Sequence, residues 1–225
     1  MKWWQYIAYF WYIAINWNIK IAWYIVKNEW NGEKKYGINT IGYDELHHLT
    51  LMEVNIEHAS IYMPADYSLL EIALNHLQLP HTHFVDIGCG KGRAMCVAAH
   101  FGFTEITGIE LSPKLYSDAQ ENIVITKKLY PNVKFHLINN DAFYTPIPIN
   151  TNCICLYNPF DEIIMQQVIL NINKSLQKKP RTIEVIYITP LHKHLFLEEG
   201  YTETFHKLIQ QYMEISILQK SSKHL

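Results

Sequence analysis

From about residue 68 the chain alternates between short apolar runs and longer segments with apolar residues at helical spacing. The first helical segment ends near Pro80 and carries one apolar side, made of Leu69, Leu70, Ile72, Ala73 and Leu77. Short apolar runs typical of buried strands follow at residues 82–87, 105–110, 133–138, 153–157 and 182–189. Helical spacing returns between them at residues 93–100, 113–126 and 161–176. Strands separated by helices predict a doubly wound α/β domain with a parallel sheet.

The C-terminal part of the chain departs from this alternation. After Gly200, the segments TETFHKLI and QQYMEISIL follow each other directly, with no helical pattern between them. Two adjacent strands of this kind predict an antiparallel hairpin at the edge of the sheet. The expected fold is therefore a mostly parallel seven-stranded sheet with a terminal antiparallel hairpin.

The N-terminal segment at residues 3–26 is crowded with Trp, Tyr and Ile, and only Gln5, Asn16, Asn18 and Lys20 interrupt it. Its length matches a bilayer span, but Lys20 near the middle is costly in hydrocarbon, and Trp and Tyr prefer the membrane interface. No small-x-small cleavage site follows it. Three interpretations remain, in order of preference: an aromatic helix packed on the domain, a helix lying on a membrane surface, and a membrane span.

A polar stretch with three glycines follows this segment, and it predicts a linker or a loop wrapped over the domain. We therefore expect an aromatic-rich N-terminal helix and linker over residues 1–60, and the α/β domain over residues 61–225.

Composition and charge limit the possible functions. A chain of 225 residues with 49% hydrophobic residues suits one domain with a modest extension, and a net charge of −2 does not favour a nucleic-acid partner. The four cysteines have neither disulfide-framework nor zinc spacing, which indicates reduced thiols and a cytoplasmic setting, with membrane association through residues 3–26 as the open alternative. The twelve histidines form no recognisable ligand set, so no metal site is predicted.

The stretch FVDIGCGKGR at residues 84–93 places three glycines after an apolar strand. A phosphate-binding P-loop needs a Lys followed by Ser or Thr after its last glycine, whereas Arg93 and Ala94 follow Gly92. A dinucleotide-binding loop needs a third glycine where this chain has Arg93. Both phosphate-binding interpretations therefore fail at a specific residue.

The remaining pattern, Asp86-x-Gly88-x-Gly90-x-Gly92, resembles motif I of the class I S-adenosylmethionine-dependent methyltransferases. The resemblance covers roughly residues 61–190 and implies S-adenosylmethionine as the cofactor. It implies that Asp86 helps to hold the methionine end of the cofactor. The backbone of Gly88, Cys89 and Gly90 would lie against that end, because glycine permits a close approach.

Two further acidic positions match the same family. Glu110 ends the second strand, and the resemblance implies that its carboxylate accepts hydrogen bonds from both ribose hydroxyls, with Leu111 beside it at the cofactor. NAD enzymes bind ribose through an acid at the same position, so Glu110 alone does not distinguish the two cofactors. Asp141, after the third strand, resembles the acid that accepts the adenine amino group, and the backbone at Ala142 would read the ring edge.

The fourth strand runs into Asn158-Pro159-Phe160, at the position of motif IV, where amine methyltransferases carry Asn-Pro-Pro-Tyr or Asp-Pro-Pro-Phe. The resemblance implies that Asn158 holds the target nitrogen next to the methyl group, and so lies beside both the acceptor and the cofactor. This chain has one proline fewer, which leaves the acceptor class open. The alternative is that Asn158 and Pro159 simply cap the next helix.

The segment Tyr62-Met63-Pro64-x-x-Tyr67 looks like the entry segment of seven-stranded protein-lysine methyltransferases, and the chain is also similar to uncharacterised bacterial methyltransferases. The resemblance implies that Tyr62 and Tyr67 line the methyl-transfer channel. The alternative is a tyrosine packed against the first helix. The expected function is N-methylation of a protein lysine. A small-molecule acceptor, a non-catalytic cofactor-binding scaffold and a hydride-transfer enzyme are the alternatives.

Overall fold

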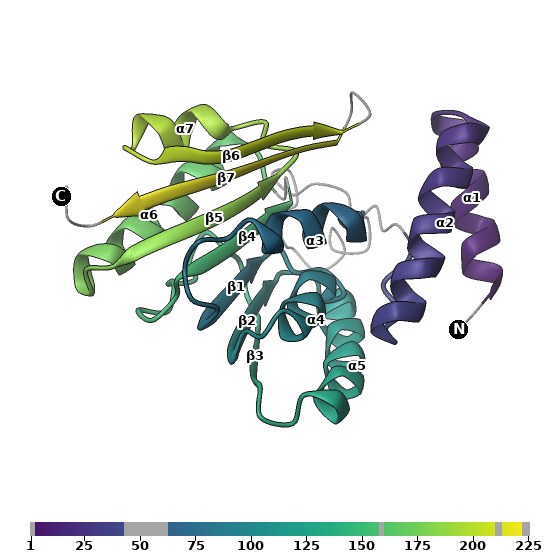
Figure 1. The fold of residues 1–225 in the computed structure, drawn as a ribbon, viewed down its shortest axis with the longest axis horizontal. Coiled ribbons are helices and arrows are strands. Elements are labelled where there is room, and N and C mark those ends of the chain that lie inside the picture. The colour runs from purple at the N-terminus through teal and green to yellow at the C-terminus, as the bar shows by residue number, and fades with distance from the viewer. Residues whose placement is uncertain (1–2, 43–62, 158–159, 210–212, 222–225) are drawn as a thin grey trace.

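The computed structural model describes residues 3–42, 63–157, 160–209 and 213–221. Its elements follow the order seen in Figure 1: α1 (Trp3–Asn16), α2 (Ile19–Tyr36), α3 (Tyr67–Asn75), β1 (His83–Ile87), α4 (Arg93–His100), β2 (Glu105–Glu110), α5 (Pro113–Leu129), β3 (Lys134–Asn139), β4 (Cys153–Tyr157), α6 (Glu162–Lys178), β5 (Thr182–Ile188), α7 (Lys193–Glu198), β6 (Thr202–Ile209) and β7 (Met213–Ser221).

The strands form one seven-stranded sheet in the order β3-β2-β1-β4-β5-β7-β6. The strands from β3 to β5 run parallel, while β7 pairs antiparallel with both β5 and β6. The predicted fold class is therefore confirmed. Strand order reverses between β1 and β4, and open sheets of this kind bind ligands at the carboxyl ends of the strands near such a reversal.

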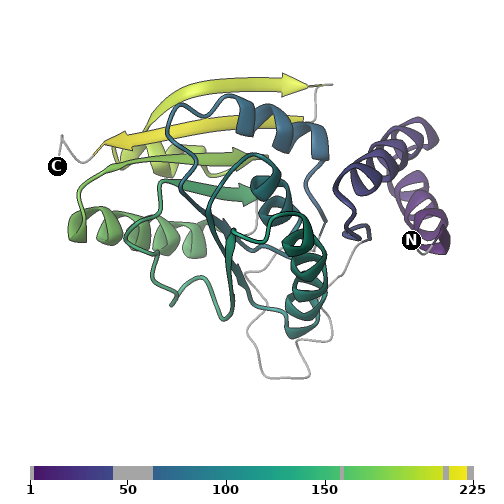
Figure 2. The ribbon, with the colours of Figure 1, turned by 60° about the horizontal axis from the view of Figure 1, so that its bottom comes forward.

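Helices cover both faces of the sheet, as the two views in Figures 1 and 2 show. On one face, α3 and α4 pack on Phe84, whereas on the other face α6 and α7 pack on Val85 and Ile87. Successive residues of β1 thus point to opposite faces, as the strand period requires. Every residue of β1 is buried, which fits a central parallel strand that is covered on both sides.

The N-terminal extension is a pair of helices, whereas the aromatic run predicted one helix followed by a linker. The break falls at Asn18, whose backbone is extended and whose side chain accepts a hydrogen bond from the backbone N–H of Ile21 at 2.9 Å. Asparagine is a favoured N-cap, so it begins a second helix rather than continuing the first. Helix α2 then continues through the polar stretch as far as Tyr36, and α1 and α2 lie together at one end of the molecule (Figures 1 and 2).

No helix in the described part of the chain is both long enough and apolar enough to cross a membrane.

Candidate functional site

The backbone conformation of the loop between β1 and α4 depends on its three glycines. Gly88, Gly90 and Gly92 have φ angles of 75°, 54° and 78°, in the left-handed region that glycine adopts without strain. The backbone N–H groups of Gly88 and Cys89 both donate to the Ile109 carbonyl of β2, at 2.9 Å and 3.0 Å. The loop therefore lies against the carboxyl end of the neighbouring strand.

Glu110 connects this loop to the next one. Its Oε2 accepts a hydrogen bond from the backbone N–H of Gly90 at 2.7 Å, and its Oε1 accepts one from the backbone N–H of Ser112 at 2.8 Å. The residue is 7% exposed. A carboxylate oxygen can accept more than one hydrogen bond, so a group that orients both loops in this way can also accept from a ligand.

Asp86 lies near the end of β1 and is 5% exposed. None of the described residues donates a hydrogen bond to its carboxyl group. Burial, together with the negative charge of Glu110, raises the pKa of Asp86 to about 8. A buried carboxyl group without a donor among these residues fits a cationic or hydrogen-bond-donating ligand, since an unpaired buried polar group is otherwise costly.

The turn after β3 is held by side chains on both sides. Asp141 Oδ1 accepts from the backbone N–H of Phe143 at 2.8 Å, and its carbonyl accepts from the Thr145 hydroxyl at 2.6 Å. Ala142 is buried, and its carbonyl and that of Phe143 accept from the Asn171 amide of α6, at 3.4 Å and 3.0 Å. The backbone around Ala142 is thus fixed.

Sequence reasoning did not single out Ser112, Asn139 or Asn171 as parts of this site. The Asn139 amide donates to the carbonyls of Glu110 and Leu111, at 2.8 Å and 3.0 Å, and so ties the ends of β2 and β3 together. Polar residues at the carboxyl ends of strands are a usable signal for Asn139. Asn171 lies 29 residues from Ala142, and nothing in the sequence indicates that contact.

Arg93, the first residue of α4, turns out to hold the N-terminal extension. Its guanidinium forms a pair of hydrogen bonds with the Glu29 carboxylate of α2, of which Nη1 to Oε1 is 2.7 Å. It also donates to the Ala65 carbonyl at 2.6 Å and to the Thr40 hydroxyl at 2.8 Å. The residue that breaks the dinucleotide spacing in the sequence is therefore the contact between the glycine loop and α2.

The segment after α2 runs along the same loop. Lys91 Nζ donates to the Ile41 carbonyl at 3.0 Å. The Asn122 amide of α5 donates to the carbonyls of both Asn39 and Lys91, each at 3.0 Å. The backbone N–H of Ile41 also donates to Glu33 Oε1 of α2 at 2.7 Å. Residues 39–41 are thus attached both to the loop between β1 and α4 and to α2.

Of the three residues predicted to be catalytic, only Tyr67 lies within the described part of the chain. Its ring stacks on that of Tyr36 with centroids 5.5 Å apart, and its hydroxyl lies 3.0 Å from the Thr40 hydroxyl. The Arg93 guanidinium carbon is 4.0 Å from the ring centroid. These are the contacts of a packed tyrosine, and a part in methyl transfer stays a prediction. Tyr62 and Asn158 lie outside the described residues.

The four cysteines are free and buried. Burial raises the pKa of the Cys89 thiol well above its usual range, so this thiol stays protonated and acts as a small apolar group in the loop. In the described ranges, no cluster of three His, Cys, Asp or Glu side chains could hold a metal ion.

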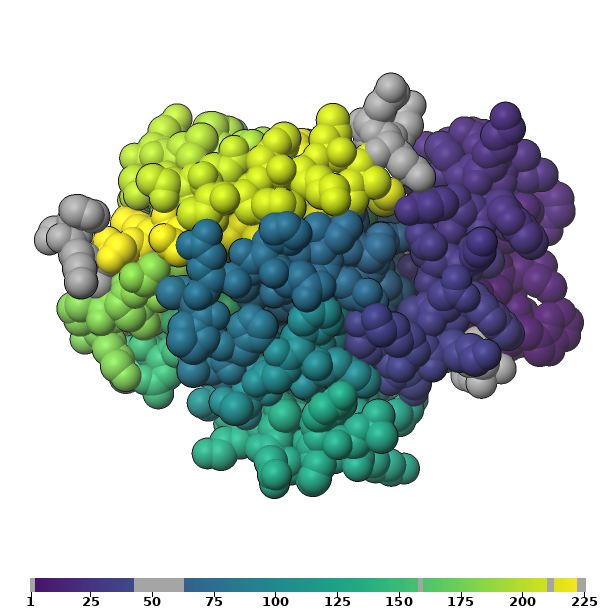
Figure 3. Space-filling model, viewed as in Figure 1, coloured from purple at the N-terminus to yellow at the C-terminus, as the bar shows by residue number. Residues whose placement is uncertain are grey.

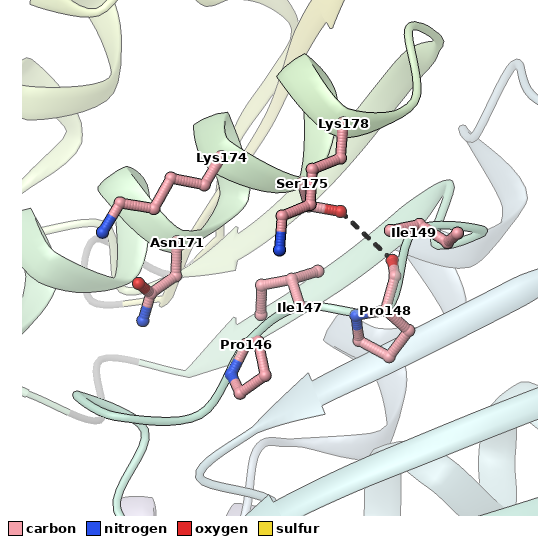
Figure 4. A pocket seen from close by; sticks show the side chains of 8 residues that line it. All are labelled: Pro146, Ile147, Pro148, Ile149, Asn171, Lys174, Ser175 and Lys178. Carbon is pink, nitrogen blue, oxygen red and sulfur yellow. Dashed lines mark hydrogen bonds between the residues drawn. The ribbon is translucent and has the colours of Figure 1, made fainter.

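A shallow depression of about 380 Å³ lies elsewhere, between residues 146–149 and helix α6 (Figure 4). The Ser175 hydroxyl donates to the Pro148 carbonyl across it, at 3.3 Å. Residues 146–149 lead into β4, so this depression is at the amino end of that strand. Asp86 and Glu110 lie at the carboxyl ends of their strands, so the depression is at the opposite end of the sheet.

Solved structures share this fold at low sequence identity. A ribosomal protein L11 methylase from Lactobacillus delbrueckii subsp. bulgaricus aligns with a TM-score of 0.51 and 14% identity, over 68% of this chain and 77% of that one. A SAM-dependent methyltransferase from Leishmania major aligns with a TM-score of 0.51 and 14% identity, over 67% of this chain and 71% of that one. A putative O-methyltransferase from Nostoc punctiforme aligns with a TM-score of 0.55 and 18% identity, over 68% of this chain and 56% of that one.

The model of a methyltransferase-domain family matches residues 79–217, which is more than half of the chain. A search of curated protein sequences finds no match. The chain belongs to this family and is a class I methyltransferase with a Rossmann-like fold. Membership implies S-adenosylmethionine as the methyl donor.

Proposed function

We propose that this methyltransferase transfers the methyl group of S-adenosylmethionine to a nitrogen atom, and that the acceptor is a protein lysine side chain. One observation carries the cofactor part of the proposal. The buried carboxyl groups of Asp86 and Glu110 stand at the carboxyl ends of adjacent strands, with the glycine loop between them.

The chemistry of these groups fits the cofactor. The methionine end carries a protonated amino group, which would pair with Asp86, whose carboxyl has no hydrogen-bond donor among the described residues. The two ribose hydroxyls would donate to Glu110. The adenine ring would meet Asp141 and the backbone at Ala142. A pyrophosphate would instead bring negative charge towards the buried carboxyl group of Asp86, which argues against a dinucleotide in this loop.

Bound S-adenosylmethionine would supply an electrophilic methyl group on a sulfonium. The chain would then have to position a neutral amine in line with it and exclude water. Asn158 follows β4, the strand next to β1, and its amide oxygen would accept a hydrogen bond from the target nitrogen. A lysine side chain must lose a proton first, and an aromatic, poorly solvated surrounding favours its neutral form.

Calorimetry with S-adenosylmethionine and its demethylated product tests the cofactor part of the proposal. We expect Asp86→Ala and Glu110→Ala to abolish binding, whereas Asn158→Ala keeps binding and loses turnover. Glu198→Ala, at an exposed acid on α7, is the control and should bind as the wild type does. If the wild type binds neither compound, the proposal fails.

Methyl labelling of a cell lysate tests the acceptor part. Labelled S-adenosylmethionine and the wild type should transfer label to protein, and hydrolysis of that protein should release methylated lysine. Label found only in small molecules would overturn the lysine acceptor and leave the methyltransferase reaction intact. A protein that binds the cofactor but labels nothing would be a non-catalytic scaffold.

A further inference from the structure

The helices α1 and α2 expose an unusual apolar surface. All six tryptophans of the chain lie within residues 3–30, and each is between 46% and 69% exposed. Three isoleucines that are also exposed accompany them. We call this set the tryptophan surface, and it consists of Trp3, Trp4, Ile7, Trp11, Ile15, Trp17, Ile19, Trp23 and Trp30. Its two helices form one end of the molecule (Figure 3).

Packing among the residues that the structure describes does not account for this surface. The inner side of α1 is already buried through Tyr6, Tyr9 and Ile13. Trp4, Ile7 and Trp11 follow at helical spacing on another side, which is exposed. A helix on the surface of a soluble domain normally presents polar residues there, so α1 has one apolar side more than its own fold uses. Contiguous exposed apolar surfaces mark binding sites.

The exposed charged side chains on α1 and α2 are all positive. Residues 1–28 contain no Asp or Glu, and the first two acids, Glu29 and Glu33, are both buried. Lys20, Lys27 and Lys34 are exposed on α2. The chain as a whole carries a net charge of −2, so this end is basic against an acidic average. The electrostatic complement of such a surface is negatively charged.

The amino-acid composition of α1 and α2 suits the headgroup layer of a membrane rather than its hydrocarbon centre. Residues 3–30 contain six tryptophans and no leucine. The indole ring, with one polar N–H on a large apolar body, is enriched at the membrane–water interface rather than at the bilayer centre. Lysines beside such rings can reach lipid phosphates, because their stems lie along apolar surface while the ammonium stays in water. Helices with aromatic and basic residues in this combination lie in the plane of the interface.

We infer that the tryptophan surface binds an anionic membrane surface, with the indole rings in the headgroup layer and Lys20, Lys27 and Lys34 against lipid phosphates. The opposite side of α2 stays on the domain through Glu29 and Arg93. Binding in this way holds the methyltransferase at the membrane, where its acceptors would then be found. The inference does not depend on which acceptor is methylated.

Intrinsic fluorescence of the full chain tests this directly, because all six tryptophans belong to the surface in question. Vesicles of equimolar phosphatidylcholine and phosphatidylserine should shift the emission to shorter wavelength and carry the protein in sedimentation. Vesicles of phosphatidylcholine alone should bind it more weakly. Lipids brominated near the headgroup should quench the emission more than lipids brominated near the end of the chain.

Matched variants separate the surface from general hydrophobicity. Trp4→Ser, Trp11→Ser and Trp23→Ser combined should weaken vesicle binding by at least about tenfold. The control combines Leu129→Ser, Ile163→Ser and Leu208→Ser, whose side chains are 56% to 61% exposed elsewhere on the molecule, and it should bind as the wild type does. Lys20→Glu with Lys27→Glu should weaken binding by roughly fivefold or more per lysine and reduce its salt dependence.

Four results would overturn the inference. The first is that the protein binds neither kind of vesicle, and the second is that the control variant loses as much vesicle binding as the tryptophan variant. The third is that lipids brominated near the end of the chain quench the tryptophan emission more strongly than lipids brominated near the headgroup. The fourth is a shift of the emission to shorter wavelength without lipid, accompanied by dimer formation in sedimentation velocity. The last result would mean that a second copy of the chain covers the surface.

Discussion

Glu29 of α2 and Arg93 of α4 form an ion pair that is buried on both sides, at 2% and 3% exposure, and joins residues 64 positions apart. Burial raises the pKa of Glu29, and the Arg93 charge opposes that rise. Because Arg93 directly follows the glycine loop, this pair fixes the N-terminal helices to the proposed cofactor site.

Glu29→Gln should destabilise the protein strongly. It leaves the Arg93 guanidinium buried without its counter-charge, and breaking a buried ion pair in this way costs about 3–5 kcal/mol. Chemical denaturation measures the change in the free energy of unfolding. Lys35→Gln is the control, because the pair between Lys35 and Glu71 is on the surface, and its loss should change stability by less than about 1 kcal/mol. Equal effects of the two substitutions would contradict the role given to Glu29.

Gly32→Ala should also be destabilising, although alanine forms helices better by about 1 kcal/mol. A Cβ at residue 32 would lie 2.1 Å from Cδ2 of the Tyr67 ring, so α2 and the ring must move apart. The thermal midpoint should fall, and the Tyr67 contacts with Thr40 and Arg93 should weaken with it. Asn31→Ala, at the exposed neighbouring position, provides the control and should be neutral or slightly stabilising. A stable Gly32→Ala variant would show that this close approach is not required.

Cofactor affinity should depend on pH through Asp86. Its pKa of about 8 lies above the usual 3.8, so the neutral acid is favoured in the folded protein. Its contribution to folding stability is therefore complete below the usual pKa and is lost as the pH rises towards 8. A protonated amino group requires the ionised form, so affinity should rise roughly tenfold per pH unit below pH 8 and then level off.

Calorimetry in buffers with different ionisation enthalpies would measure the proton released when the cofactor binds at low pH. Asp86→Asn should bind weakly, with little pH dependence and no proton release from this position. A pH profile shared by the wild type and Asp86→Asn would assign the titration to another group.

Glu110→Gln should impair the site in spite of its nearly equal size. The amide nitrogen of glutamine cannot accept a hydrogen bond, so either the Gly90 or the Ser112 backbone N–H loses its partner. We expect a loss of about 1–3 kcal/mol of stability and weaker cofactor binding. Glu105→Gln, at the other end of β2 and more exposed, should leave binding unchanged. Retained affinity in Glu110→Gln would exclude its proposed ribose contact.

The alternation of apolar runs and helical segments was enough to predict the sheet, its mostly parallel direction and the C-terminal hairpin, because each element has its own local period. The break at Asn18 was not predicted, although asparagine is a good cap, since the aromatic residues on both sides continue the same pattern. The partner of Arg93 could not be predicted either. The sequence showed only that Arg93 stands where a dinucleotide-binding loop needs a glycine.

Local patterns were enough to place Asp86, Glu110 and Asp141 at the ends of strands and to identify the family of the glycine loop. Three features are visible only in the folded chain: Glu110 connects two loops, Asp86 has no donor among the described residues, and Glu29 joins the N-terminal helices to the site. The contacts of Glu110 with Gly90 and of Glu29 with Arg93 join residues 20 and 64 positions apart, and burial gives them their strength. Local patterns carry no information about which distant residues become partners, so these contacts are established only when the chain folds.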